Sequence, residues 1–287
     1  MNIIQNSIGE IPFTKYDFKQ KSELIFLHAN AFPPNCYIPL FRELGNKFNI
    51  ICPHFRPLWA NSGSPEILLD WSPLKDDMIK FLEKYGLENY NLLGHSLGGH
   101  IAFRIAIENP KLVNNAILMD PIIFPRLQMF IWKIIQWTQF GVKLHPMIQS
   151  SKNQKMIHDS IEELLNKYRT KKIFKKINDK NLEYLISGLT KKTADGRIKI
   201  AFPKDWELRI YQAGGGSDKY IWRNVKNLKR NILLIHAGKT HAPDLKIVNK
   251  IKNKSNFIDS KYLADNSHFF PFEMPIELNK LINNFLI

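Results

Sequence analysis

The motif G-H-S-L-G at residues 94–98 constrains this chain more than any other feature. The apolar run before it, residues 91–94, predicts a strand, and residues 97–108 predict a helix. A turn that leads straight from strand to helix is strained, and flanking glycines remove the side chains that would collide there. Ser96 would therefore project from the turn, beside the free N–H groups and positive dipole end of the helix. In this context the motif predicts a nucleophilic serine.

Strand-like and helix-like segments alternate through the first 120 residues and again near the C-terminus. The predicted strands are Leu24 to His28, Ile50 to Pro53, Asn91 to Gly94, Ala116 to Asp120, Asn231 to His236 and Phe257 to Leu263. Helices are predicted over residues 72–85, 97–108 and 245–251, and after Pro275. Such alternation is typical of a mostly parallel sheet flanked by helices, so we expect an α/β fold.

The helix predicted over residues 72–85 has the clearest pattern. Its apolar residues recur at helical spacing, at Leu74, Met78, Phe81, Leu82 and Tyr85. Ser72 is predicted to cap its N-terminus and Pro73 to occupy the first helical position. We therefore expect an amphipathic helix that packs on the sheet.

The middle of the chain, residues 122–227, has little strand pattern and is predicted to be an inserted helical cap. The core domain would then comprise residues 1–121 and 228–287. Leu127 to Phe140 predicts a helix that is apolar on most of its circumference, so it either packs in a core or lines an apolar pocket. Ser160 and Glu163 have the spacing of a capping box at the start of a second helix.

Composition excludes several classes of protein. The net charge is +15, but the lysines are scattered, which favours a solvated surface over a nucleic-acid interface. Cys36 and Cys52 lie in no C-x-x-C or Cys/His spacing, so we expect neither disulfides nor a metal site, and a cytoplasmic location. The first 13 residues lack the pattern of a secretory signal, and the longest apolar stretch falls short of the roughly 20 residues that span a bilayer. We expect no stable membrane insertion; the oligomeric state stays open.

A serine hydroxyl needs a positioned base, and nine histidines are available. His95 is adjacent to Ser96, so its ring cannot reach the serine hydroxyl. His100 lies one helical turn further on, on the wrong side of the turn for a base delivered from a separate loop. His268 follows the last predicted strand, in a loop that would reach over the carboxyl edge of the sheet. His268 is therefore the predicted general base.

Four segments in this order resemble the α/β-hydrolase superfamily over almost the whole chain. Residues 27–34 (L-H-A-N-A-F-P-P) resemble the H-G-x loop that supplies half of the oxyanion hole. Residues 54–59 lie where relatives carry D-x-R-G-x-G, residues 94–99 match the nucleophile elbow, and residues 267–273 resemble the stretch that holds the catalytic histidine. The combination H-A-N-x-F-P, R-P-L-W and G-H-S-L-G-G is especially similar to a subgroup of bacterial hydrolases of poorly defined substrate.

This resemblance implies an oxyanion hole made by the main-chain N–H groups of Leu97 and Asn30. Donors fixed in this way stabilise a tetrahedral intermediate by about 3 kcal/mol each. Ala29 stands where relatives have glycine, so Ala31 and Phe32 are alternatives to Asn30 as the donor. The resemblance implies no metal or organic cofactor.

The acid departs from the commonest pattern of the family, in which it follows a strand after the cap. His241 stands where an aspartate would be expected there, with Asp244 nearby. Some family members place the acid directly after the strand that follows the nucleophile helix, and Asp120 occupies that position. We favour Asp120 over Asp244; the alternative is that Asp120 only holds a loop by backbone hydrogen bonds.

We therefore expect a serine hydrolase that cleaves carboxylic esters of apolar, short to medium substrates through an acyl-enzyme. Phe32, Trp132 and Phe269 are predicted to contact the small-molecule ester. The alternatives are a carbon–carbon bond hydrolase, an acyltransferase, a non-catalytic binding protein of the same fold, and a lipid binder whose 127–140 helix lies in the membrane interface. Serine at position 96 argues against haloalkane dehalogenases and epoxide hydrolases, which have aspartate there.

Overall fold

A computed structural model describes the chain except residues 87, 126–127, 130–145, 215–217, 241–242 and 287. Its centre is an eight-stranded sheet in the order β1-β2-β4-β3-β5-β6-β10-β11. The strands are β1 (Asn2–Ile8), β2 (Ile11–Asp17), β3 (Ser22–Leu27), β4 (Phe48–Pro53), β5 (Tyr90–His95), β6 (Val113–Met119), β10 (Asn231–Lys239) and β11 (Ile258–Ser267). All neighbours from β4 to β11 pair in parallel, and β2 pairs antiparallel with both β1 and β4. The predicted α/β fold with a mostly parallel sheet is confirmed.

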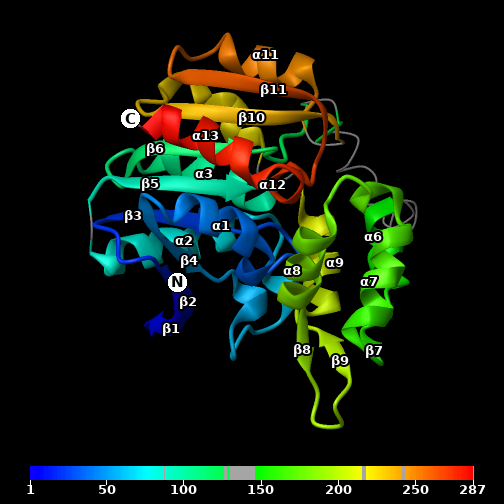
Figure 1. The fold of residues 1–287 in the computed structure, drawn as a ribbon. Coiled ribbons are helices and arrows are strands. Elements are labelled where there is room, and N and C mark those ends of the chain that lie inside the picture. The colour runs from blue at the N-terminus through cyan, green and yellow to red at the C-terminus, as the bar shows by residue number, and fades with distance from the viewer. Residues whose placement is uncertain (87, 126–127, 130–145, 215–217, 241–242, 287) are drawn as a thin grey trace.

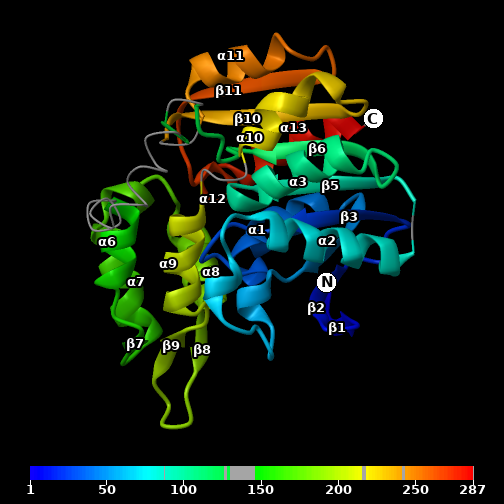
Figure 2. The ribbon, with the colours of Figure 1, turned by 180° about the vertical axis from the view of Figure 1, so that it is seen from behind.

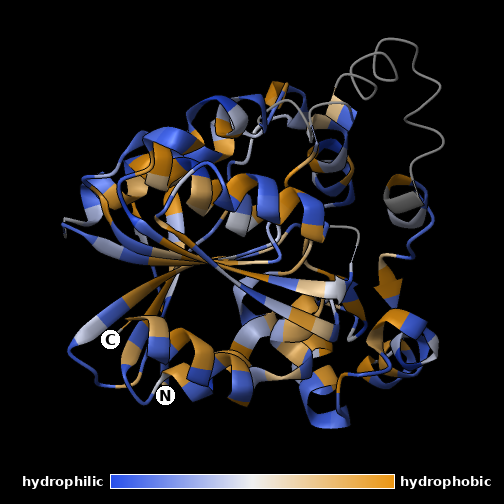
Figure 3. Ribbon diagram, turned by 90° about the horizontal axis from the view of Figure 1, so that it is seen from above, coloured by the Kyte–Doolittle hydropathy of each residue, from blue (hydrophilic) through white to orange (hydrophobic). Residues whose placement is uncertain are grey.

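Helices cover both faces of this sheet (Figures 1 and 2). One face carries α1 (Ile38–Leu44), α12 (Phe270–Glu273) and α13 (Pro275–Leu286), and the other carries α2 (Ser72–Tyr85), α3 (Leu97–Glu108), α10 (Asp218–Asn224) and α11 (Leu245–Lys252). Figure 3 shows the mostly hydrophobic strands between the two helical layers. Buried side chains accordingly form two core clusters, one on each face.

The described part of the segment between β6 and β10 is mainly helical, and most of it lies beside one end of the strands (Figure 1). It contains α6 (Pro146–Lys152), α7 (Ile161–Thr170), α8 (Asp179–Leu189) and α9 (Lys204–Ala213), besides α10. A small antiparallel sheet, β7 (Ile157–His158), β9 (Ile198–Ile200) and β8 (Thr190–Lys192), joins them. Strands of two or three residues are too short to produce a detectable alternation. The division into a core and a cap at residues 122 and 227 stays a prediction.

Short 3-10 turns connect several of these elements. They are η1 (Pro34–Tyr37), η2 (Arg56–Leu58), η3 (Pro65–Ile67), η4 (Lys172–Phe174) and η5 (Val225–Asn227). None of the helices in the described parts of the chain is both long enough and apolar enough to cross a bilayer. The predicted helix from Leu127 to Phe140 lies almost entirely outside the described residues, and so does Trp132.

The predicted helix ends are partly confirmed. At α7 the Ser160 hydroxyl accepts a hydrogen bond from the Glu163 N–H at 3.0 Å, as a capping box requires. The Glu163 carboxylate accepts from the N–H of Asp159 at 2.8 Å, one residue earlier than in the standard box. The prediction that Ser72 caps α2 is wrong. Ser72 is the first helical residue, and its hydroxyl accepts from the Arg104 guanidinium at 2.9 Å, so it is engaged with α3.

Candidate active site

Ser96 occupies a strained turn between β5 and α3. Its backbone has φ 57° and ψ −113°, a positive φ that costs a non-glycine residue about 1–3 kcal/mol. A Cβ atom at Gly98 would collide with the backbone of Leu27, and one at Gly94 would collide with the backbone of Gly98. These two glycines therefore allow β3, β5 and α3 to approach closely enough to form the turn.

Three side chains from distant parts of the chain meet at this turn. The Ser96 hydroxyl lies 3.0 Å from Nε2 of His268, which follows β11. On the other side of the same ring, Nδ1 lies 2.6 Å from Oδ2 of Asp120, which follows β6. The Asp120 side chain is fully buried, whereas that of His268 is 26% exposed. The structure therefore brings together the three residues predicted as nucleophile, base and acid; their catalytic roles stay a prediction.

The Asp120 carboxylate is surrounded by donors. Its Oδ1 accepts from the Ala237 N–H at 3.0 Å, and its Oδ2 accepts from the Thr240 hydroxyl at 2.6 Å as well as from His268. Burial acts to raise the pKa of Asp120, but the hydrogen bonds from His268, Thr240 and Ala237 outweigh it and hold the pKa below its ordinary value. Asp120 is thus kept as a carboxylate, the form that can accept the Nδ1–H of His268.

The alternative acid, Asp244, has a different place in the structure. It caps the N-terminus of α11, where its Oδ1 accepts from the Ile247 N–H at 2.8 Å. A cap of this kind satisfies a backbone donor that the helix itself cannot pair. The geometry therefore places Asp120, rather than Asp244, against His268.

The loop after β3, which carries the proposed oxyanion donor, is held at Ala29. The carbonyl of Ala29 accepts from Nδ1–H of His28 at 2.8 Å and from the N–H of Phe32 at 3.3 Å. The N–H of Phe32 is therefore engaged within this loop. Asn30 and Ala31 lie between Ala29 and Phe32. The N–H of Asn30 donates to no other described residue, and Ala31 has a positive φ of 64°.

Leu97 provides the second candidate donor. It is the first residue of α3, and the first N–H groups of a helix have no acceptor within it. The side-chain amide of Asn30 donates a hydrogen bond to the carbonyl of Glu207 on α9 at 3.2 Å. This bond ties the loop after β3 to the helical segment. The oxyanion role of Asn30 and Leu97 stays a prediction.

Aromatic rings lie on one side of the base. The ring of Phe269 lies 5.5 Å from that of Phe32 and 5.0 Å from that of Phe174, and 5.8 Å from the imidazole of His268. Phe32 and Phe269 are half-buried, so part of each ring remains accessible. Phe174, in η4, was not identified from the sequence, because nothing local connects it with residue 269.

His100 is fully buried, and its Nδ1 is engaged by residues other than Ser96. Its Nδ1 lies 2.8 Å from the carbonyl oxygen of Ile122 and 3.1 Å from Oδ1 of Asp218. The prediction that His100 is on the wrong side to act as the base agrees with this position. Among the described residues, no three His, Cys, Asp or Glu side chains lie together as a metal ion would require.

Comparisons with known proteins place this chain in a family. A family model described as "alpha/beta hydrolase fold" matches residues 24–284. Ethanol acetyltransferase 1 of Wickerhamomyces anomalus is 25% identical over 225 residues, covering 73% of this chain and 51% of that protein. Abhydrolase domain-containing protein abhd-5.2 of Caenorhabditis elegans is 39% identical over 69 residues, covering 23% of this chain and 16% of that protein. The chain thus spans about half the length, or less, of these curated relatives.

Solved structures resemble the chain over nearly its whole length. The structure of E-2-(acetamidomethylene)succinate hydrolase gives a TM-score of 0.79 at 15% identity and covers 99% of both chains. An esterase of Mycobacterium tuberculosis gives a TM-score of 0.73 at 16% identity, covering 99% of this chain and 91% of the esterase. At such identities these likenesses show the fold.

Proposed function

We propose, from the premise that the chain belongs to the alpha/beta hydrolase fold family and is an enzyme of the hydrolase type, that it is a serine hydrolase of carboxylic esters. The observation that carries this proposal is the hydrogen-bonded series from Ser96 through His268 to Asp120, with distances of 3.0 and 2.6 Å. A serine beside a base that is itself oriented by a buried carboxylate is the arrangement that activates a hydroxyl for acyl transfer.

The first half of the reaction would form an acyl-enzyme. Nε2 of His268 takes the proton of Ser96 while Oγ attacks the ester carbonyl carbon. The resulting oxyanion would accept hydrogen bonds from the N–H groups of Leu97 and Asn30. His268, now an imidazolium stabilised by Asp120, returns the proton to the alkoxide as the carbon–oxygen bond breaks. The alcohol leaves, and the acyl group remains on Ser96.

The second half would release the acid. A water molecule gives a proton to Nε2 of His268 as its oxygen attacks the acyl carbon. The bond between that carbon and Oγ breaks, and Ser96 recovers its proton from His268. Asp120 holds Nδ1–H throughout and thereby keeps Nε2 free to accept. No redox change and no cofactor enter these steps.

The accessible parts of Phe32 and Phe269 support an apolar acyl or alcohol group of short to medium length. Both rings are half-buried; Phe269 lies beside His268 and Phe32 lies beside Phe269, where an ester held at Ser96 would contact them. Trp132 stays a predicted contact, since it lies outside the described residues. The helical segment between β6 and β10 would act as a cap over this region.

A second candidate is acyl transfer to an alcohol. It is favoured by one observation, the 25% identity with ethanol acetyltransferase 1 of Wickerhamomyces anomalus over 73% of this chain. The chemistry differs only in the second half, where an alcohol replaces water as the group that attacks the acyl-enzyme.

The test uses p-nitrophenyl butyrate and a fluorophosphonate probe. We expect the protein to hydrolyse the ester and to be labelled by the probe, and Ser96→Ala to lose both, with at least a 10⁴-fold fall in kcat, an order of magnitude typical of removing the nucleophile. Ser151→Ala, at another buried serine, on α6, is the matched control and should keep both activities. Ethyl butyrate formed in the presence of ethanol would reveal transfer, whereas butyric acid alone would indicate hydrolysis. If Ser96→Ala matches the parent protein, the proposal is wrong.

A further inference from the structure

His95, the residue before the nucleophile, makes two hydrogen bonds that connect separate parts of the candidate site. Its Nε2 lies 2.9 Å from the main-chain carbonyl oxygen of His268, and its Nδ1 lies 2.7 Å from the hydroxyl of Tyr37 in η1. The same hydroxyl accepts a hydrogen bond from the N–H of Ala29 at 3.3 Å. His95 and Tyr37 are fully buried. A continuous series of bonds therefore runs from the loop after β3 to the backbone of the proposed base.

The chemistry of the partners fixes the direction of every bond in this series. A carbonyl oxygen only accepts, so Nε2 of His95 must carry the hydrogen that reaches His268. In a neutral imidazole Nδ1 then accepts, and the Tyr37 hydroxyl donates to it. The oxygen of Tyr37 keeps a lone pair for the N–H of Ala29. Every donor in the series faces an acceptor, with none left over.

The ring of His95 is neutral. Burial, followed by the proximity of His268, lowers the pKa of His95 to about 3, so the ring carries no charge near neutral pH. Its centroid lies 4.9 Å from that of the His268 ring. A neutral ring at this distance does not oppose the positive charge that His268 acquires when it takes the proton of Ser96.

We propose that His95 and Tyr37 are positioning residues, which hold the backbone of His268 and the peptide of Ala29 in one rigid unit around Ser96. The inference rests on the proposed function, since it assigns these residues a role in the reaction of Ser96. His95 fixes the main chain of His268 while Asp120 orients its ring. Tyr37 fixes the peptide that precedes the proposed oxyanion donor, Asn30.

Two features separate this role from ordinary core packing. First, Tyr37 and His95 are joined to two different loops by polar bonds, and each loop carries a predicted functional group. Second, the buried His95 donates to the main-chain carbonyl of His268, and the ring of the same residue must stay within hydrogen-bond reach of Ser96. A displacement of about 1 Å at a reacting group costs as much as a hundredfold in rate.

The experiment compares three variants at position 95 and one at position 37. His95→Phe keeps a ring but removes both bonds, and we expect kcat for p-nitrophenyl butyrate and the rate of fluorophosphonate labelling to fall 10- to 100-fold with KM changed less than about threefold. His95→Gln places an amide N–H where Nε2 stands and should recover kcat to within about fivefold of the parent. His95→Asn is too short to reach the carbonyl of His268 and should resemble His95→Phe. Tyr37→Phe deletes one oxygen atom and should lower kcat by about tenfold, and it keeps the proposal testable if the variants at 95 do not fold.

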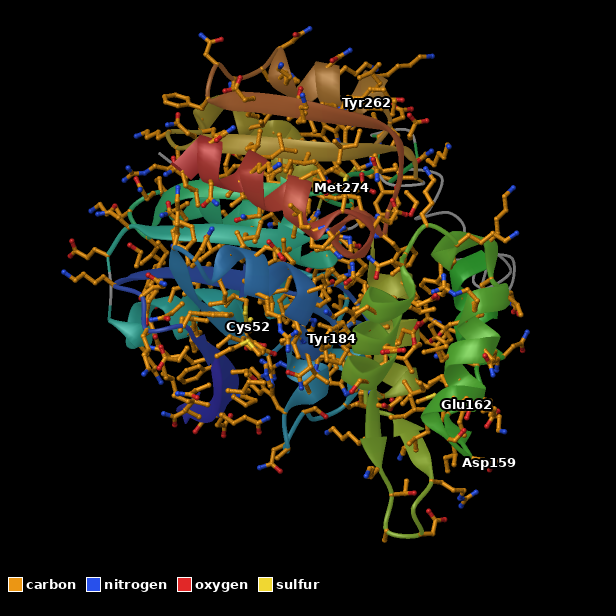
Figure 4. All side chains as sticks on the ribbon, in the orientation of Figure 1. Cys52, Asp159, Glu162, Tyr184, Tyr262 and Met274 are labelled. Atoms are coloured by element: carbon orange, nitrogen blue, oxygen red, sulfur yellow. The ribbon has the colours of Figure 1, made fainter. Side chains whose placement is uncertain are left out.

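The matched control is His158→Phe. His158 is also buried, and both its ring nitrogens are bonded, to Glu163 at 3.1 Å and to the carbonyl of Lys155 at 2.9 Å. Figure 4 shows the next residue, Asp159, at the end of the helical segment. It lies far from the sheet and from Met274, which follows α12, the short helix next to His268 in the chain. His158→Phe should lower the melting temperature but leave kcat unchanged.

The outcomes separate this proposal from the proposed function. If Ser96→Ala is inactive while folded His95→Phe and Tyr37→Phe keep kcat within twofold of the parent, the positioning role is overturned and the serine mechanism stands. A loss in His95→Gln equal to that in His95→Phe, or an equal loss in His158→Phe, would also overturn it. If Ser96→Ala remains active, the proposed function itself fails, whatever the variants at 95 do.

Discussion

Replacing Asp120 with asparagine tests the candidate site most directly, because it changes one atom and one charge in a fully buried place. Oδ2 of Asp120 accepts from His268 and Thr240, and Oδ1 accepts from Ala237. An asparagine offers only one oxygen. If that oxygen faces Ala237, the amide NH₂ faces Nδ1 of His268 and forces the hydrogen of that ring onto Nε2. His268 in this tautomer cannot take the proton of Ser96.

The expected loss of activity has two contributions. To keep the productive tautomer, the amide must turn its NH₂ group toward the N–H of Ala237, and two buried donors that face each other cost about 1–3 kcal/mol. The imidazolium also loses a carboxylate, whose attraction is about 4 kcal/mol for charges about 4 Å apart at an effective dielectric constant of 20. At about 1.4 kcal/mol for each factor of ten, kcat/KM should fall by about 10⁴ to 10⁵.

The assay is hydrolysis of p-nitrophenyl butyrate at pH 7.5, with the melting temperature as a check on folding. Asp244→Asn is the matched control, since asparagine caps a helix about as well as aspartate and Asp244 caps α11. It should keep kcat/KM within twofold of the parent. The reasoning is refuted if folded Asp120→Asn loses less than tenfold, or if Asp244→Asn loses more than Asp120→Asn.

The same variant has a predicted effect on stability against pH. The folded-state pKa of Asp120 is depressed, so its carboxylate stabilises the fold above the unfolded pKa of about 3.9, and this contribution is lost as the pH falls through the lower folded value. The difference in free energy of unfolding between the parent and Asp120→Asn should therefore be largest near neutral pH. It should shrink below pH 4 in urea titrations.

Thr240→Val removes one donor from Asp120 and should lower kcat about tenfold, whereas Thr240→Ser should stay within about twofold; equal kcat values for the two variants would contradict this role. Gly98→Ala would drive a Cβ atom into the backbone of Leu27 and should lower the free energy of unfolding by more than about 3 kcal/mol in urea titrations. Gly99→Ala, whose Cβ would lie 3.1 Å from its nearest atoms, should lose much less. Burial raises the pKa of Glu207 to about 7, so the parent should lose stability as the pH rises from 4.5 through 7. Glu207→Gln should lack that loss and gain about 3 kcal/mol over the parent between pH 4.5 and pH 8; a constant difference across this range would refute it.

The sequence predicted the parallel part of the sheet well, because its buried strands are short apolar runs separated by helical patterns. β1 was missed for a physical reason: six of its seven residues are exposed, so no buried face imposes an alternating pattern on it. The N-terminus of α2 was misplaced because a serine before a proline resembles a cap, whereas the hydroxyl of Ser72 is used by Arg104 on α3. That contact joins residues 32 positions apart and leaves no local signal.

In the site, too, residues with a local sequence signal could be predicted, and residues that act through distant contacts could not. Ser96 could be identified from its local turn, because the glycines that the turn requires are its sequence neighbours. Thr240 and Tyr37 could not, because each contributes through a partner far away in the chain: Thr240 bonds to Asp120, and Tyr37 bonds to His95. The pairing of β3 with β5 brings the segment that carries Tyr37 to His95, and the pairing of β6 with β10 brings Thr240 to Asp120.

The proposed acid, Asp120, follows β6, and this position gives residues at the end of β10 a different role. In the commonest arrangement of this fold the acid follows the strand that here is β10. In this chain the N–H of Ala237 and the hydroxyl of Thr240, from β10 and the residue after it, both donate to Asp120 instead. Since β6 and β10 are adjacent and parallel, a carboxylate at the end of β6 lies within reach of donors at the end of β10. Residues at the end of β10 therefore contact the carboxylate that orients His268. This is why we expect a substitution at Thr240 to lower the reactivity of Ser96.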